Sequence, residues 1–412
     1  MPDSRDWGET GGQLLNRATV KLAVPTETRP GERRVALVPD VVKKLVGAGW
    51  EITVQAGAGS EAAFSDAAYH DAGATVAGDA AATLAGANLV VRVNPPSAED
   101  VVSLPESVAL LSFFGVAQAE DAVRALAAKK ATVFSFDLLP RISRAQGMDA
   151  LSSQATVSGY RAGLSAAEHL AKFFPMFMTA AGTVPPAKVF VMGVGVAGLQ
   201  SIATARRLGA VVKAFDVRAA AKEEAESLGA TFFDTGVSAE GTGGYARELT
   251  PEELDRQRLA LAVEVGRSDV VITTAAVPGR KAPVLVTASM VEGMAEGAVV
   301  VDMAADQGGN CELTVAGEIV DHNGVHVVGM ANPPSGMPTH ASFLFARNVA
   351  NVLGLMGPSG SLEPDWDDEI VAGMCVLRDG AAVAPAAVEL LGGTAGGAAG
   401  GTQGAPSQGA PS

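Results

Sequence analysis

The chain has 412 residues, 48% of them hydrophobic and 18% charged, and its 30 Lys and Arg against 45 Asp and Glu give a net charge of −15. This acidity disfavours nucleic acid and anionic bilayers as partners, so we expect no nucleic-acid binding and no direct membrane insertion. The length and the apolar content suit two α/β domains, each with its own core.

Cysteines, histidines and the first residues narrow the class of protein further. The two cysteines, Cys311 and Cys375, are far apart, and the five histidines form no metal set and no triad with a nucleophile. We therefore expect no disulfide, no metal and a reducing cytosolic compartment. Residues 1–18 are polar, which predicts a flexible leader and not a secretory signal. No uncharged apolar run reaches the roughly 18 residues of a membrane-spanning helix.

The first half of the chain alternates strand and helix patterns. The predicted strands are Val20–Val24, Ile52–Val54, Leu89–Val93, Val108–Phe113 and Thr132–Phe136. The clearest predicted helices between them are Pro39–Ala48 and Ala119–Ala128. Strands and helices that alternate at this spacing predict a mostly parallel sheet covered on both faces.

A polar cluster lies between the two halves, at residues 141–154. A long helix is predicted over Met148–Phe174 because Pro175 cannot continue it. Three polar residues spaced by three would share one face of that helix: Gln146, Asp149 and Ser152. Arg141 lies one short loop upstream. Such a cluster, followed by a nucleotide-binding pattern, suggests a site for the reactive end of a nicotinamide cofactor.

The second half repeats the α/β pattern. Its predicted strands are Lys188–Met192, Val211–Phe215, Thr231–Phe233, Val270–Ile272, Val299–Asp302 and Val325–Val328. With a helix over Val196–Leu208, they match a dinucleotide-binding open sheet. A later helix, His340–Met356, is expected to return the chain to the first domain. We thus predict the α/β class with two Rossmann-like domains and parallel sheets, the second inserted between the first and its C-terminal return helix.

A glycine-rich loop follows the first strand of the second half. Gly193 permits the tight turn, Gly195 lets the backbone approach a pyrophosphate, and Gly198 lets the helix pack closely on the strand. The N-terminus of the helix adds free N–H groups and a partial positive charge. We count Val196 and Ala197 with these glycines as cofactor-binding residues.

An acidic residue, Asp216, ends the next strand. Its carboxylate is expected to accept hydrogen bonds from the adenosine ribose and to repel a 2′-phosphate, which favours NAD over NADP. We group Val217 and Arg218 with it at the cofactor. Arg218 would soften the preference for NAD, and the alternative is a solvated charge on the following helix.

Three further loops contain candidate residues. Thr274 and Ala275 follow the fourth strand and are small enough for the cofactor to pass close to them. Gln307 and Asn310 follow the fifth strand and are candidates to orient the nicotinamide carboxamide, with a plain polar turn as the alternative. The segment 236–251, which contains Tyr245, is long enough for a lid, and a disordered insertion is the alternative.

Together these residues resemble the soluble NAD(H)-binding component of proton-translocating NAD(P) transhydrogenase, at the N-terminal end of its alpha subunit. The resemblance runs from about Val20 to about Pro385. Its markers are Arg-Pro-Gly-Glu-Arg-Arg-Val-Ala-Leu at 29–37, Arg-Ile-Ser-Arg-Ala-Gln at 141–146, Met-Asp-Ala-Leu-Ser-Ser at 148–153, Val-Pro-Pro-Ala-Lys-Val at 184–189 and Gly-Gly-Asn-Cys-Glu at 308–312.

The resemblance implies a direct, Re/Si-specific hydride transfer from NADH bound here to NADP+ on a partner subunit. It implies that four residues hold the nicotinamide and the nearby phosphate and ribose: Arg141, Gln146, Asp149 and Ser152. Gln146 would also reach toward the second nicotinamide, and Tyr245 would belong to a mobile loop over the nucleotide. The protein then has only to position the donor and exclude water.

The resemblance also implies an assembly. Longer members continue into membrane helices, whereas a Gly/Ala/Pro/Ser tail is expected here over residues 386–412. This predicts a split alpha subunit, with a separate membrane-spanning alpha-type subunit and an NADP(H)-binding beta subunit. A homodimer on the inner face of the plasma membrane is expected, inactive without its partners. The expected domains are 19–147 plus 335–385, and 148–334 for NAD(H).

The main alternative is a free-standing alanine dehydrogenase, a relative of the same fold. Alanine dehydrogenases have a substrate-binding lysine where this chain has Asn94, and a catalytic histidine where it has Gly115. Oxidative deamination would lack its proton acceptor here. A third possibility is a regulator that binds NAD(H) without catalysis.

Overall fold

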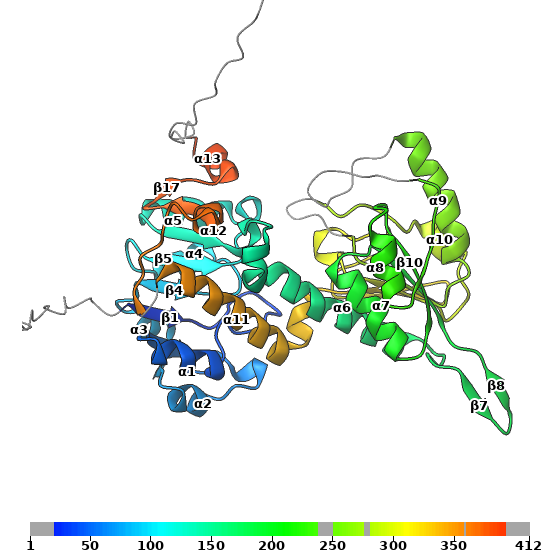
Figure 1. The fold of residues 1–412 in the computed structure, drawn as a ribbon, viewed down its shortest axis with the longest axis horizontal. Coiled ribbons are helices and arrows are strands. Elements are labelled where there is room, and N and C mark those ends of the chain that lie inside the picture. Colours follow the sequence, from blue (N-terminus) through cyan, green and yellow to red (C-terminus); the bar gives the residue numbers. More distant parts are fainter. Residues whose placement is uncertain (1–19, 238–249, 276–280, 358–359, 393–412) are drawn as a thin grey trace, which may run out of the picture.

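The computed structural model describes residues 20–237, 250–275, 281–357 and 360–392, which form two α/β domains side by side (Figure 1). The first sheet has eight strands in the order β17-β16-β6-β5-β4-β1-β2-β3. Six of them are parallel: β1 (Lys21–Val24), β2 (Glu51–Gln55), β3 (Thr75–Ala77), β4 (Leu89–Val91), β5 (Ala109–Ser112) and β6 (Thr132–Ser135). Two C-terminal strands extend this sheet in antiparallel fashion: β16 (Cys375–Arg378) and β17 (Ala381–Ala382).

Helices lie on both faces of the first sheet. They are α1 (Pro39–Gly47), α2 (Asp66–Asp71), α3 (Ala80–Leu84), α4 (Ala98–Val102), α5 (Glu120–Ala128), α12 (Glu369–Met374) and α13 (Pro385–Leu391). Every residue of β4 and β5 is buried. Strands buried on both faces read as continuous apolar runs, which is why the sequence identified them.

The second sheet has seven strands in the order β11-β10-β9-β12-β13-β15-β14. The parallel ones are β9 (Lys188–Met192), β10 (Val211–Phe215), β11 (Thr231–Phe232), β12 (Val270–Thr273), β13 (Val299–Asp302) and β15 (Val325–Gly329), and the antiparallel edge strand is β14 (Ile319–His322). Its helices are α7 (Val196–Arg207), α8 (Ala221–Ser227), α9 (Pro251–Val265) and α10 (Ala288–Glu292). The parallel strands follow the doubly wound order of a dinucleotide-binding domain, which confirms the predicted fold class.

Two long helices connect the domains. α6 (Ala150–His169) leads from the first sheet to the second, and α11 (Pro338–Met356) returns to the first (Figure 1). The two helices are held together by hydrogen bonds from Ser153 Oγ to Asn348 Oδ1 at 2.8 Å and from Gln154 Nε2 to Ala341 O at 3.0 Å. In the described part of the chain, no helix has the length and apolar character needed to cross a membrane.

The helix expected over 148–174 is wrong at both ends. Residues Ser143–Met148 form a 3-10 helix, and α6 begins at Ala150 with Asp149 as its N-cap. It ends at His169, and both Leu170 and Phe174 are buried in the core of the second domain. Burial of these two side chains takes the chain out of the helix before Pro175. Gln146 therefore does not share a helix face with Asp149 and Ser152.

The expected start of the C-terminal tail is also wrong. Helix α13 occupies Pro385–Leu391, and Ala387 is fully buried against the first domain. Residues 393–412, and the expected leader at 1–18, lie outside the described residues. A hairpin that the sequence did not predict, β7 (Phe177–Thr179) with β8 (Gly182–Val184), projects from the second domain (Figure 1).

Candidate functional site

The glycine loop between β9 and α7 can be built only from glycine at two of its positions. Gly193 has φ +97°, and a Cβ there would lie 2.6 Å from Thr274 Oγ1. A Cβ on Gly198 would lie 1.9 Å from the carbonyl oxygen of Gly193. Gly195 is the N-cap of α7, and a Cβ on it would meet nothing within 4 Å. The loop is therefore tight against its own helix and open on the other side, as pyrophosphate binding requires.

Two cofactor candidates from the segment after β12, Thr274 and Ala275, border this loop. The Thr274 hydroxyl donates to Gly193 O at 2.9 Å, which fixes the end of β12 to the loop. Val196 and Ala197 form the first turn of α7, where the N–H groups of the helix are free of helical partners. Ala275 follows Thr274, and its backbone N–H and C=O are both bound by the Asn310 side chain.

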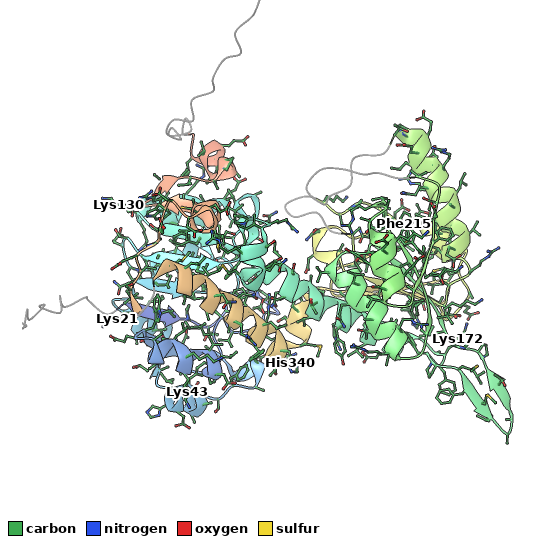
Figure 2. The ribbon with its side chains drawn as sticks, viewed as in Figure 1. Lys21, Lys43, Lys130, Lys172, Phe215 and His340 are labelled. Atoms are coloured by element: carbon green, nitrogen blue, oxygen red, sulfur yellow. The ribbon has the colours of Figure 1, made fainter. Side chains whose placement is uncertain are left out.

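Asp216 follows Phe215, the last residue of β10, which is labelled in Figure 2. Its carboxylate accepts hydrogen bonds from Val194 N at 2.8 Å and from Arg218 N at 2.9 Å. The Arg218 guanidinium adds two more, from Nε and Nη2, each at 2.9 Å. Burial acts to raise the pKa of Asp216, but the hydrogen bonds from Arg218 and Val194 outweigh it and hold the pKa below its ordinary value.

Asp216 and Arg218 form a close ion pair at the end of β10. The side chain of Asp216 is 8% exposed and that of Arg218 is 31% exposed, so the guanidinium lies over the carboxylate as a partly exposed cation. Asp216 is therefore not an unpaired carboxylate, and Arg218 is not a fully solvated charge on the following helix. Val217, between them, packs against the core of the second domain.

Three of the four candidate residues in the polar cluster at 141–154 line one cavity. Arg141, Gln146 and Asp149 lie around a cavity of about 260 Å³, at the start of α6. Ser152 does not line it but holds Asp149, with Ser152 N donating to Oδ1 at 2.9 Å and Ser152 Oγ to Oδ2 at 2.5 Å. Although the helix begins later than predicted, the 3-10 turn and the N-cap still bring Arg141, Gln146 and Asp149 together.

Helix α6 connects this cavity to the glycine loop. It starts at the cavity and crosses the first turns of α7, where a Cβ on Gly159 would lie 2.1 Å from Ala197 O. Farther along, a Cβ on Gly163 would lie 2.8 Å from Thr204 Cγ2, and Ser201 Oγ donates to Gly159 O at 3.0 Å. The sequence analysis missed these glycines. Their only sequence signal is two glycines at i and i+4 within a helical pattern.

Buried polar side chains hold the loop after β13 in place through hydrogen bonds to backbone groups. Asn310 is fully buried, and its two amide protons are donated to Ala275 O at 2.8 Å and Pro283 O at 2.7 Å. Its Oδ1 accepts from Ala275 N at 3.0 Å. Asn310 therefore holds the loops after β12 and β13 together, while Gln307 is exposed on the same loop. Asp302, also missed, accepts from the backbone N–H groups of residues 304, 310 and 311.

Asn94 belongs to a buried ionic cluster in the first domain. Its Nδ2 donates to Glu32 Oε2 at 2.8 Å and to Glu27 Oε2 at 3.1 Å. Glu32 also accepts from Arg34 Nε at 2.8 Å and Nη2 at 2.7 Å. The same carboxylate accepts from Asn332 Nδ2 at 3.1 Å and Ser335 Oγ at 3.0 Å, on the segment that returns from the second domain.

The structure adds little about the remaining candidate residues. Tyr245 and most of the segment 236–251 lie outside the described residues. Gly115 offers no base, and a Cβ on it would meet Gln118 Oε1 at 2.3 Å. Within the ranges that the structure describes, no group of three or more His, Cys, Asp or Glu is arranged to hold a metal ion.

Comparison with known proteins gives consistent results. Two family models match, "Alanine dehydrogenase/PNT, N-terminal domain" over residues 23–158 and "Alanine dehydrogenase/PNT, C-terminal domain" over residues 162–385. The chain is 48% identical over 378 residues to the first portion of NAD(P) transhydrogenase subunit alpha of Rhodospirillum rubrum, covering 89% of this chain and 98% of that protein. It is 31% identical to alanine dehydrogenase of Halomonas elongata, covering 90% and 97%.

A solved structure of transhydrogenase from Sinorhizobium meliloti is similar throughout. It superposes with a TM-score of 0.80 at 42% identity, covering 88% of this chain and all (100%) of that one. Sequence identity to these transhydrogenase relatives is therefore higher than to this alanine dehydrogenase.

Proposed function

The chain belongs to the alanine dehydrogenase/PNT family and, within it, to the alpha subunits of NAD(P) transhydrogenase, and from this membership we propose that it is the NAD(H)-binding subunit of a proton-translocating transhydrogenase. In this function NADH bound here supplies a hydride to NADP+ on a partner subunit, and membrane partners couple the transfer to proton translocation. The observation that carries the proposal is the cavity of Arg141, Gln146 and Asp149, joined through α6 to the glycine loop.

The residues divide into two binding regions. Gly193, Gly195 and Gly198 would hold the pyrophosphate, and Asp216 with Arg218 would hold the adenosine ribose. Arg141, Gln146 and Asp149 would hold the nicotinamide end. Holding two reactants in the geometry of attack lowers a barrier by about 7–11 kcal/mol in favourable cases, and hydride transfer between two nicotinamides needs no general base. Asn94 in place of a substrate-binding lysine and Gly115 in place of a catalytic histidine fit this chemistry and disfavour oxidation of an amino acid.

The partners follow from the same proposal. The NADP(H) nucleotide is carried by a beta subunit, and a separate membrane-spanning chain anchors the complex at the inner face of the plasma membrane. The transfer is Re/Si-specific, and this chain alone turns over slowly or not at all because its acceptor lies on another subunit.

A homodimer is supported by the hairpin β7–β8. From Phe173 to Ala187 the sequence contains no charged residue, and Met178 is 78% exposed at the hairpin. The rings of Phe173 and Phe177 contact each other at an angle of 58°, with their centroids 4.5 Å apart. An isolated two-stranded hairpin is marginally stable in water. We infer that a second copy of the chain covers it, because the chain itself leaves this apolar arm projecting (Figure 2).

Nucleotide binding and a rival reaction test the proposal. The purified chain should bind NADH and discriminate against NADPH, measured by nucleotide fluorescence. With NAD+ and L-alanine it should form no NADH. Turnover of alanine at ordinary enzymatic rates, without any partner, would assign the chain to the dehydrogenases. Binding of NADH without transfer under any pairing would assign it to the regulators.

A further inference from the structure

A second carboxylate lines the cavity at the start of α6. Asp137 lies in the 3-10 turn Phe136–Leu138, directly after β6, and borders the same cavity as Arg141, Gln146 and Asp149. The resemblance to the transhydrogenases assigned it no role. It comes from the first domain's sheet, whereas Asp149 caps α6.

The hydrogen bonds of Asp137 use one of its oxygens. Oδ2 accepts from Phe114 N at 2.7 Å and from Ser135 Oγ at 3.3 Å. Among the residues that the structure describes, none donates a hydrogen bond to Oδ1 and no cation pairs with the carboxylate. Burial raises the pKa of Asp137, although the hydrogen bonds from Phe114 and Ser135 act to lower it. A partly desolvated carboxylate without a counter-charge is costly for a fold, so a cationic partner outside the chain is a physical explanation for it.

Asp149 differs from Asp137 in this respect. Ser152 binds both oxygens of Asp149, through its backbone N–H and its hydroxyl. Asp149 is thereby fixed at the start of α6, whereas Oδ1 of Asp137, a residue that lines the cavity, accepts no hydrogen bond from the described residues. Two carboxylates in one cavity with different surroundings take different roles.

We propose that Asp137 is a further residue of the hydride-transfer site, where its negative charge stabilises the positive charge of the oxidised nicotinamide ring. This inference rests on the proposed function. Loss of a hydride, with both electrons of the C–H bond, converts the neutral dihydronicotinamide ring into a cation. The same hydride neutralises the nicotinamide cation of NADP+ on the partner, and no proton is released. A fixed carboxylate beside the donor ring therefore favours the direction NADH to NADP+.

The proposal makes a selective prediction for binding. Asp137→Asn removes the charge and keeps an oxygen that can accept from Phe114 N. The dissociation constant for NAD+ should rise about tenfold, which corresponds to about 1.4 kcal/mol, and that for NADH should change less than about twofold. The measurement is equilibrium titration of each nucleotide with the full chain. Asp121→Asn, which removes the same charge from an exposed first turn of α5, should leave both constants unchanged.

The titrations separate failure of the role of Asp137 from failure of the proposed function. An unchanged ratio of the two constants in folded Asp137→Asn overturns the role of Asp137. Equal weakening of NAD+ and NADH also overturns it, because a merely structural role would affect both. Asp137→Ser provides the same comparison if the Asn variant does not fold, as judged by circular dichroism. Failure of the unaltered chain to bind either nucleotide would instead contradict the proposed function.

Discussion

In the proposed function, the carboxylate of Asp216 and the guanidinium of Arg218 have opposite effects on nucleotide selectivity. With the carboxylate present, a 2′-phosphate is repelled, and with the guanidinium present it is attracted. In the structure each is held by the other, at 2.9 Å. If these residues bind the adenosine ribose as proposed, we expect selectivity to depend on both members of the pair and not on the acid alone.

Two substitutions separate these effects. Asp216→Ala should weaken NADH binding by about 1.5–3 kcal/mol, since it removes charge-assisted hydrogen bonds, and should narrow the advantage over NADPH. Arg218→Ala should widen that advantage by exposing the carboxylate. Both are measured by fluorescence titration with the two nucleotides. Unchanged selectivity in Asp216→Ala would remove this residue from the site.

Glu32 makes the fold sensitive to acid. Burial acts to raise its pKa, but hydrogen bonds and charge from Arg34, with a further hydrogen bond from Asn94, lower the pKa to about 2 from its ordinary value of 4.5. A carboxyl with a depressed pKa stabilises the fold above its unfolded pKa and loses that contribution as the pH falls through the folded value. The contribution of Glu32 is thus complete above about pH 5 and lost toward pH 2, and its size is on the order of 3 kcal/mol.

The test compares Glu32→Gln with the unaltered chain in denaturant unfolding at several pH values. At pH 7 the variant should be less stable, and the difference between the two proteins should shrink as the pH falls from about 5 to about 2. A difference that stays constant over this range would mean that the Glu32 charge does not contribute.

Single residues were predicted well where the chemistry depends on backbone shape. Gly193 and Gly198 were identified because no other residue fits the turn, and the structure places a hypothetical Cβ at 2.6 Å or closer to a neighbour. Asn310 was harder to interpret, because a sequence pattern places an amide near a loop without saying which groups it binds. Asp137 gave no signal, since its role depends on a cavity that distant segments enclose.

At the scale of elements, α6 sets the relation between the two binding regions. Two of the nicotinamide candidates lie at its start, Asp149 as the N-cap and Ser152 in the first turn, and Gly159, about 15 Å farther along the axis, contacts α7 at the glycine loop. The sequence predicted this helix but not its ends. The ends depend on burial of Leu170 and Phe174 and on capping by Asp149, which are tertiary and local effects that a helical period does not contain.

Gly159→Ala tests the contact between the helices. The added methyl would meet the backbone oxygen of Ala197, so α6 and α7 must move apart, at a cost of about 1–3 kcal/mol in unfolding free energy. NADH affinity should fall with it. Gly354→Ala is the matched control, since a Cβ there meets nothing within 4 Å on helix α11. The control should be neutral or slightly stabilising. Equal stability of the two variants in thermal unfolding would rule out the close contact.

The whole molecule combines two doubly wound sheets, and this overall fold was predicted from the sequence more completely than the helix ends or the site contacts. Parallel strands buried on both faces gave unmistakable apolar runs. The antiparallel strands β14, β16 and β17 and the hairpin β7–β8 were missed because each strand has only two to four residues. In addition, β14 and β17 lie at sheet edges and the hairpin is exposed, whereas β16 is buried between β17 and β6. They do not define the fold class, and the hairpin is the segment that we propose a second copy of the chain covers.

The hairpin prediction concerns oligomeric state. Met178→Lys should place a charge in the proposed dimer contact and shift the chain toward monomer at micromolar concentration, as measured by sedimentation equilibrium. Val102→Lys is the control, because Val102 is 74% exposed, comparable to Met178, but lies on α4 in the other domain. A dimer that survives Met178→Lys with unchanged affinity would place the interface elsewhere.

The central claim is that this chain presents its nicotinamide to a nucleotide on another subunit. The most direct measurement uses NADH deuterated at the transferred position of C4, mixed with the chain, an NADP(H)-binding beta subunit and NADP+. The account predicts that the deuterium appears in NADPH without exchange into water, and only when both subunits are present. Deuterium lost to solvent, or NADPH formed without the partner, would contradict it.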